Sequence, residues 1–175
     1  MKKFLKIFIA IAVLVLAGGA VYYFVKSRPV NKLFQPEVLN QTLPESQKIY
    51  ENGKYGFSFS HPKEFNLSEF PEGGADVVLV SDAKASGIFQ ISVSPFDEPG
   101  PITKERILQD IPDMPISNDK EISVGGEKAL SFINKNAAGE TFEIWFVYAG
   151  NLYQISALPS FEKELLKILA TWKFQ

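Results

Sequence analysis

His61 is the side chain with the clearest potential for catalysis or metal binding, because it is the only histidine of the chain. As a base or a ligand it would need a carboxylate partner such as Glu64, Asp76 or Asp82. It comes directly before Pro62 at the end of a predicted strand, and no other ligand follows it at a suitable spacing. This position indicates a structural or solvent-exposed histidine. With one histidine and no cysteine, the sequence also argues against a zinc site.

Other catalytic patterns are missing from the sequence. There is no Gly-x-Ser-x-Gly motif, so a serine hydrolase would have to use His61 as its base. The carboxylate pairs Asp97/Glu98 and Glu162/Glu164 have the spacing of surface charge. Paired glycines at 73–74 and 125–126 indicate turns rather than phosphate-binding loops, since no Gly-Lys-Ser/Thr follows them. We therefore expect no enzymatic activity, no cofactor and no metal.

Aromatic side chains are the better candidates for a functional surface. Phe65, Phe70 and Phe96 lie in or beside predicted loops, and exposed aromatic residues often mark protein contacts. The alternative for these three is that they fold back into the core. We expect the core position for Trp145 and Trp172.

Charge is distributed unevenly along the chain. All 20 acidic residues follow Lys26, whereas four of the 18 basic residues lie at or before it, so the remainder carries 14 − 20 = −6. An acidic domain is a poor binder of polyanions, and we expect no nucleic-acid partner.

The N-terminal segment Phe4–Val25 is apolar, and its single charge, Lys6, lies near its start. The uncharged run from Ile7 spans about 28 Å as a helix, which matches the hydrocarbon core of a bilayer. Residues 1–26 are therefore predicted to be a signal anchor, with the lipid bilayer as its partner. The alternative is a signal peptide cleaved near Ala20, after which the protein would be secreted.

The predicted orientation places the C-terminal part outside the cytoplasm. A short basic N-terminal tail ahead of the apolar run is the usual signal for that topology, although basic residues also follow the run. Residues 27–48 contain Pro29, Pro36 and Pro44, which bar a regular helix or a central strand, so this stretch is predicted to be a linker. The globular domain is expected over residues 49–175.

Period-two hydrophobicity predicts strands through most of this domain. Phe57 and Phe59 alternate with small polar residues, and Thr141–Tyr148 is apolar on both faces, as expected of a central strand. A glycine pair between two alternating runs predicts a hairpin. The predicted strands are Tyr55–Ser60, Val77–Val80, Ile88–Ser94, Glu121–Val124, Lys128–Ile133, Thr141–Tyr148 and Leu152–Leu158.

Two helices complete the prediction. Thr103 has the side chain of an N-cap for a helix that runs to about Asp110, before Pro112. A second helix opens at Pro159, and its apolar residues recur at helical spacing as far as Trp172. The fold class is therefore α+β, with an antiparallel sheet flanked by helices.

Four segments resemble PsbP-like domains: Tyr50–Pro62, Val124–Phe132, Asn151–Ala157 and Ile168–Phe174. The resemblance covers Ile49–Gln175 and implies an α/β/α sandwich around an antiparallel sheet. The best-known member of that family is an extrinsic, non-enzymatic subunit that stabilises the oxygen-evolving side of photosystem II. This chain differs by its predicted anchor and by the lack of a thylakoid transit region, so the photosynthetic role does not carry over.

The sequence thus predicts a membrane-anchored accessory domain that binds another envelope protein. Two alternatives stay open. An envelope domain for a small ligand or ion would need a pocket beside the sheet. An envelope hydrolase would need His61 close to a serine or to a pair of carboxylates.

Overall fold

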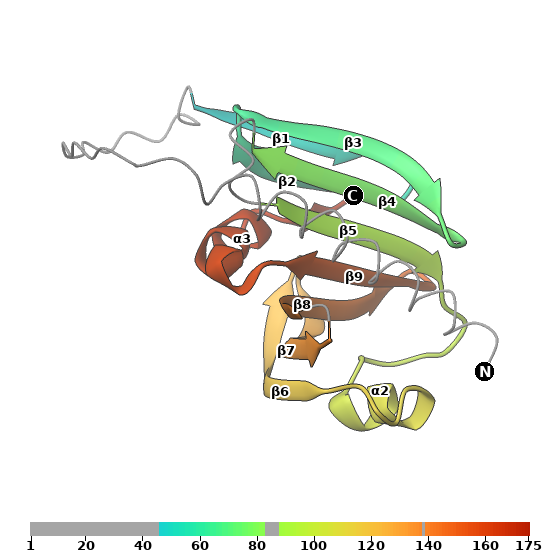
Figure 1. The fold of residues 1–175 in the computed structure, drawn as a ribbon. Coiled ribbons are helices and arrows are strands. Elements are labelled where there is room, and N and C mark those ends of the chain that lie inside the picture. Colours follow the sequence, from blue (N-terminus) through green and yellow to red (C-terminus); the bar gives the residue numbers. More distant parts are fainter. Residues whose placement is uncertain (1–45, 83–87, 138) are drawn as a thin grey trace, which may run out of the picture.

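The computed structural model describes residues 46–82, 88–137 and 139–175 (Figure 1). The predicted membrane segment, residues 1–26, and nearly all of the predicted linker lie outside these ranges. Within them, no helix is long and apolar enough to cross a membrane. The first strand starts at Gln47, two residues before the predicted start of the domain.

A seven-stranded antiparallel sheet forms the centre of the fold, with the strand order β3-β4-β5-β9-β8-β7-β6. Paired glycines with positive φ angles form the turns after β3 and β6. This arrangement confirms the predicted hairpin at Gly125-Gly126 and the predicted central strand. The strands of this large sheet are β3 (Phe65–Glu72), β4 (Ala75–Asp82), β5 (Ile88–Pro95), β6 (Ile116–Val124), β7 (Glu127–Asn136), β8 (Gly139–Tyr148) and β9 (Asn151–Ala157).

A second, three-stranded sheet packs on one face of the large sheet. It consists of β1 (Gln47–Asn52), β2 (Phe57–Pro62) and the short β10 (Lys173–Phe174), in the order β1-β2-β10. The short helix η1 (Pro159–Phe161) leads into α3 (Glu162–Leu169), which covers the same face through Leu165, Ile168 and Leu169. The expected single sheet is therefore accompanied by a smaller one.

Stacked aromatic rings fill the space between the two sheets. The Trp172 ring lies 4.4 Å from Phe57 and 5.6 Å from Phe59, centroid to centroid and nearly parallel to both. Its edge meets the Phe146 ring of the large sheet at 6.0 Å. Trp172 and Trp145 are 4% and 1% exposed, so the predicted core positions of both tryptophans are confirmed.

The other face of the large sheet is partly covered by α2 (Lys104–Asp110). The Thr103 side chain accepts a hydrogen bond from the Arg106 backbone N–H at 3.3 Å, so the predicted N-cap is confirmed. Ile107 and Ile111 pack in a second cluster that also contains Trp145. Helices thus lie on both faces of the sheet, which agrees with an α+β fold (Figure 1).

Three strands were not predicted: β1, whose first two residues lie in the predicted linker, β3 and β10. Phe65 and Phe70 are predicted to lie in or beside loops, but residues Phe65–Glu72 form β3 at the edge of the large sheet. Its last four residues do not alternate in burial, because an edge strand is covered less completely than a central one, and this removes the period-two signal. Strand β10 has only two residues, too few for any periodicity.

The glycine pair after β6 allows a test of the packing between the sheets. A Cβ atom at Gly125 would lie 2.7 Å from Cδ1 of Trp172, whereas a Cβ at Gly126 meets nothing within 4 Å. Both positions have positive φ, so alanine costs about 1–2 kcal/mol of backbone strain at either. We expect Gly125→Ala to lower the free energy of unfolding by about 1–3 kcal/mol more than Gly126→Ala, because only it overpacks the core. Urea denaturation of the two full-length variants measures this difference, and equal losses would contradict the packing described.

Candidate functional site

His61 is built into the core between the sheets. It is 4% exposed, its Nδ1 donates to the carbonyl oxygen of Pro62 at 2.8 Å, and its ring meets the edge of Phe59 at 6.1 Å. No serine or carboxylate is bonded to it among the residues that the structure describes. In the same residues, no three His, Asp or Glu side chains form a group that could hold a metal ion. His61 therefore has the surroundings of a structural residue.

The three phenylalanines singled out from the sequence have different surroundings. Phe96 is 8% exposed and packs under the Arg106 guanidinium, 4.9 Å from the ring centroid. Phe65 is half-buried, and its ring lies 6.1 Å from that of Phe161. Phe70 is 38% exposed. Phe96 and Phe65 thus have packing partners of their own, and Phe70 presents the most ring surface of the three. Whether it contacts another protein stays a prediction.

Phe70 lines a surface cavity of about 240 Å³ that we call the hairpin groove. One wall comes from the β1–β2 hairpin, residues 51–55, and another from β3, residues 69–71. Residues 76–78 of β4 and Val93 of β5 complete the lining. The groove therefore lies where the small sheet meets the edge of the large one.

Tyr50 joins the two walls beside this groove. Its hydroxyl donates to Oε1 of Glu69 at 2.9 Å and accepts from Nδ2 of Asn52 at 3.0 Å. Burial raises the pKa of Tyr50 to about 12, and the bond to Glu69 adds to this rise. The phenol consequently stays protonated at neutral pH and keeps donating to Glu69.

Asp76 joins the walls at a second point. Its Oδ2 accepts from Nζ of Lys54 at 2.5 Å and also from the Tyr55 hydroxyl. These two hydrogen bonds hold the pKa of the Asp76 carboxyl below its usual range, and the bond to Lys54 has the larger effect. The bonded pairs Tyr50–Glu69 and Tyr55–Asp76 are 19 and 21 residues apart in the chain, so local sequence patterns carry no signal for them.

The groove carries more negative than positive charge. Its lining residues include three acidic ones, Glu51, Glu69 and Asp76, and one basic one, Lys54. Lys54 pairs with Asp76, while no cation pairs with Glu51 or Glu69 among the described residues. The volume of about 240 Å³ is smaller than the roughly 300–1,000 Å³ of small-molecule pockets. The arrangement suits an ionic surface contact better than enclosure of a ligand.

Glu143 is a further titratable group that the sequence analysis passed over. It lies in β8, is fully buried, and accepts from Oγ1 of Thr141 at 2.6 Å. Nε1 of Trp145 donates at 3.2 Å, and the Ser156 hydroxyl also donates. Burial raises the pKa of Glu143, although all three bonds act to lower it. The sequence did contain a signal for this buried carboxyl group: an acidic residue inside a strand that was predicted to be covered on both faces.

The raised pKa of Glu143 has a consequence for stability. The pKa of Glu143 is higher in the folded state than in the unfolded state, so proton binding by Glu143 stabilises the fold. This contribution is complete at pH values below the unfolded-state pKa and is lost as the pH rises through the folded-state pKa. We therefore expect the wild type to gain stability relative to Glu143→Gln when the pH is lowered from 8 to 5. Urea denaturation of both proteins at the two pH values measures this. A difference between them that does not change with pH would contradict a raised pKa.

No family model matches the chain, and no curated protein matches it. Among solved structures, the fold is similar to the solution structure of cyanobacterial PsbP (CyanoP) from Synechocystis sp. PCC 6803, with a TM-score of 0.55 and 11% sequence identity. The match covers 79% of this chain and 98% of that one. A crystal structure from Bacteroides thetaiotaomicron VPI-5482 has a TM-score of 0.49 and 17% identity, over 74% of this chain and 49% of that chain. The resemblance read from the sequence motifs is thus confirmed at the level of structure: the domain has a PsbP-like fold.

Proposed function

We propose that this protein is a membrane-anchored accessory protein whose domain lies outside the cytoplasm and binds another envelope protein, without catalysis of its own. The PsbP-like fold supports this proposal, because the best-known PsbP-like protein is an extrinsic, non-enzymatic subunit of a larger complex. The surroundings of His61 are also those of a packed core residue rather than a catalytic base.

The observation that carries the binding proposal is the exposed ring of Phe70 beside the hairpin groove. The large hydrophobic residues exposed in the described part of the chain are Ile49, Phe70 and Leu166, and of these Phe70 lines the groove. Aromatic residues are enriched in the buried centre of protein interfaces. An exposed aromatic side chain at the edge of a sheet is a group expected of a protein contact.

The small-ligand alternative receives less support. The hairpin groove and a second groove beside α2 each have a volume of about 240 Å³, and charged side chains line both. A site for an apolar ligand would need a larger and less polar cavity.

Photocrosslinking at position 70 tests the binding proposal. We expect full-length protein with benzoylphenylalanine in place of Phe70 to form one reproducible, light-dependent adduct with an envelope protein in intact cells. The matched control carries the same probe in place of Leu166 on α3, which is 37% exposed, nearly the same as Phe70. Mass spectrometry identifies the adduct. Absence of an adduct at position 70, or equal adducts at both positions, would contradict the proposal.

Membrane extraction tests the anchor. The apolar run Phe4–Val25 is long enough to span the hydrocarbon core, so we expect the full chain to stay in the membrane fraction after alkaline carbonate treatment. The most N-terminal peptide should then begin before Ala20. A soluble protein whose first peptide begins directly after Ala20 would show cleavage and secretion instead.

A further inference from the structure

We propose that residues 33–43 of the predicted linker pack on the large sheet, on the side away from the small sheet, where they cover β4 and β5. The proposal does not depend on an envelope partner. It applies equally to an anchored chain and to one cleaved near Ala20, because both contain these residues. It starts from a part of the sheet that is buried although no described element lies over it.

The strand registers define this surface, which we call the β4–β5 face. Val77 is paired with Ser92, Ser92 with Gln154, and Gln154 with Trp145, which packs in the cluster under α2. Directly opposed residues of an antiparallel pair point to the same side of a sheet, and so do alternate residues of one strand. The β4–β5 face, on the side of Trp145, therefore comprises Val77, Leu79, Gln90, Ser92 and Gln154.

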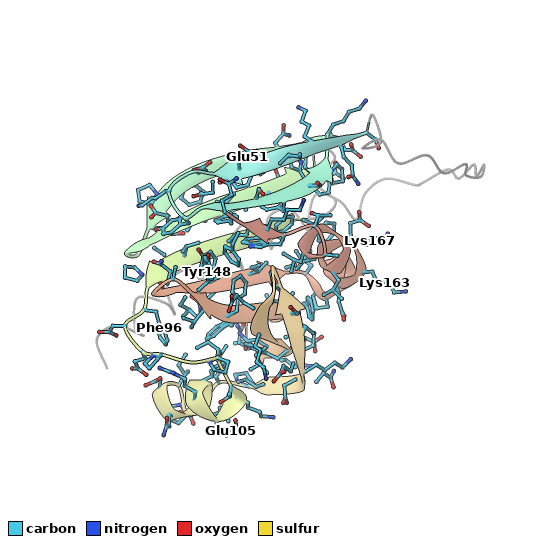
Figure 2. The ribbon with its side chains drawn as sticks, turned by 180° about the vertical axis from the view of Figure 1, so that it is seen from behind. Glu51, Phe96, Glu105, Tyr148, Lys163 and Lys167 are labelled. Carbon is cyan, nitrogen blue, oxygen red and sulfur yellow. The ribbon has the colours of Figure 1, made fainter. Side chains whose placement is uncertain are left out.

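The β4–β5 face is buried, although α2 does not cover it. Val77 is 1% exposed, and Ser92 and Gln154 are each 5% exposed. The cluster under α2 takes its strand residues from β6 to β9, and Val77 belongs to neither of the two hydrophobic clusters formed by described residues. Glu105 of α2 lies at the end of the molecule far from Glu51 and the small sheet (Figure 2). The face therefore needs a cover that the described elements do not supply.

Two polar atoms on this face lack a hydrogen-bond partner among the described residues. They are Oγ of Ser92 and Nε2 of Gln154, and both are buried. Buried polar groups in folded proteins are nearly always hydrogen-bonded. The cover must therefore offer hydrogen-bonding groups to these two atoms as well as apolar groups to Val77 and Leu79. A segment of polypeptide has both, whereas the acyl chains of a lipid have only the second kind.

The predicted linker contains both kinds of group. A linker that stays in solvent is normally poor in large apolar residues, because exposed apolar surface favours burial. Residues 33–43 do not have that composition, since five of these eleven residues are large and apolar: Leu33, Phe34, Val38, Leu39 and Leu43. The same segment carries amide and hydroxyl groups on Asn40, Gln41 and Thr42. Its composition thus matches the requirements of the β4–β5 face.

The linker joins the described domain beside the edge of this face. The Lys63 N–H donates to the carbonyl oxygen of Ser46 at 2.8 Å, and Lys63 comes two residues before Phe65, where edge strand β3 starts. To reach β5 from there, the chain has to pass round the edge and cross two strand spacings, about 10 Å for each step. The stretch from Ser46 back to Leu39 spans about 23 Å when extended, so Leu39 can reach the face.

The exposure of Phe70 limits the width of the cover. Phe70 lies opposite Val77 in the register of β3 and β4, yet it is 38% exposed while Val77 is 1% exposed. The cover therefore ends between two adjacent strands, which are about 5 Å apart. A single segment of chain fits this narrow boundary better than a second copy of the domain. It also leaves the Phe70 ring available for the partner proposed above.

Thiol labelling tests this proposal on the full chain in lipid nanodiscs, which avoid free detergent. The chain has no cysteine, so Ser92→Cys introduces a single thiol at the β4–β5 face. We expect a soluble maleimide to label this thiol about tenfold faster when Phe34→Ser/Leu39→Ser is added, because the linker then no longer covers the face. Mass spectrometry of quenched samples measures the rate. The matched linker control, Asn31→Ser/Gln35→Ser, removes no apolar side chain, and we expect it to change the rate less than twofold.

Ser131→Cys provides the control on the other side of the sheet. Ser131 is 4% exposed, nearly the same as Ser92, but it lies opposite Ile144, which belongs to the core that faces the small sheet. We expect the labelling rate at this position to be the same with the wild-type linker and with Phe34→Ser/Leu39→Ser.

Three results would overturn the proposal. Labelling of Ser92→Cys as fast as in the urea-unfolded chain would show that the chain does not cover the face. Phe34→Ser/Leu39→Ser that leaves the rate unchanged, or raises it equally at positions 92 and 131, would show that the linker is not a local cover. Labelling that slows as the protein concentration rises would identify a second copy as the cover instead.

Discussion

The packing of Trp172, Phe57 and Phe59 against the aromatic rings of the large sheet, Phe146, Tyr153 and Phe89, is the interaction that holds the small sheet against the large one. A buried aromatic side chain removes roughly 150–250 Å² from water, which contributes about 4–6 kcal/mol at 25 cal/mol per Å². The indole Nε1 of Trp172 is buried without a hydrogen-bond partner in the described structure, at a cost of about 1–3 kcal/mol. The packing gain exceeds this cost, which explains how an unsatisfied polar atom is tolerated at the centre of the core.

The hairpin groove depends on the same packing. Its walls belong to different sheets, so its shape exists only while the aromatic layer keeps the β1–β2 hairpin in place beside β3. Tyr50 links the two levels, since its ring contacts Phe57 and Phe59 while its hydroxyl bonds to Glu69. The surface carboxylate and the core are thus connected through one side chain. A substitution deep in the aromatic layer would therefore change the shape of the groove, even though the substituted residue does not line it.

Much of this fold could be predicted from the sequence where a local pattern reports a local cause. The capping side chain of Thr103, the turn at Gly125-Gly126 and the doubly covered strand β8 each have such a pattern. Edge strand β3 lacks such a pattern because it is only partly buried, so its last four residues do not alternate in burial. Strand β10 lacks one because it is too short for any alternation to show. Phe70 was identified by its residue type, but its polar neighbours come from hairpins about twenty residues apart. Only the tertiary arrangement brings these residues together.

The pairing of β2 with β10 also has a consequence for biosynthesis. Until Lys173 and Phe174 have been made, β2 has β1 as its partner in the small sheet, and the inward faces of Phe57 and Phe59 lack Trp172. The bond from the Ser60 N–H to Oγ1 of Thr171 spans 111 residues. Contacts of such long range form late and slow down folding. The emerging chain therefore carries an exposed aromatic strand during most of its synthesis, and a truncation before Trp172 would make that exposure permanent.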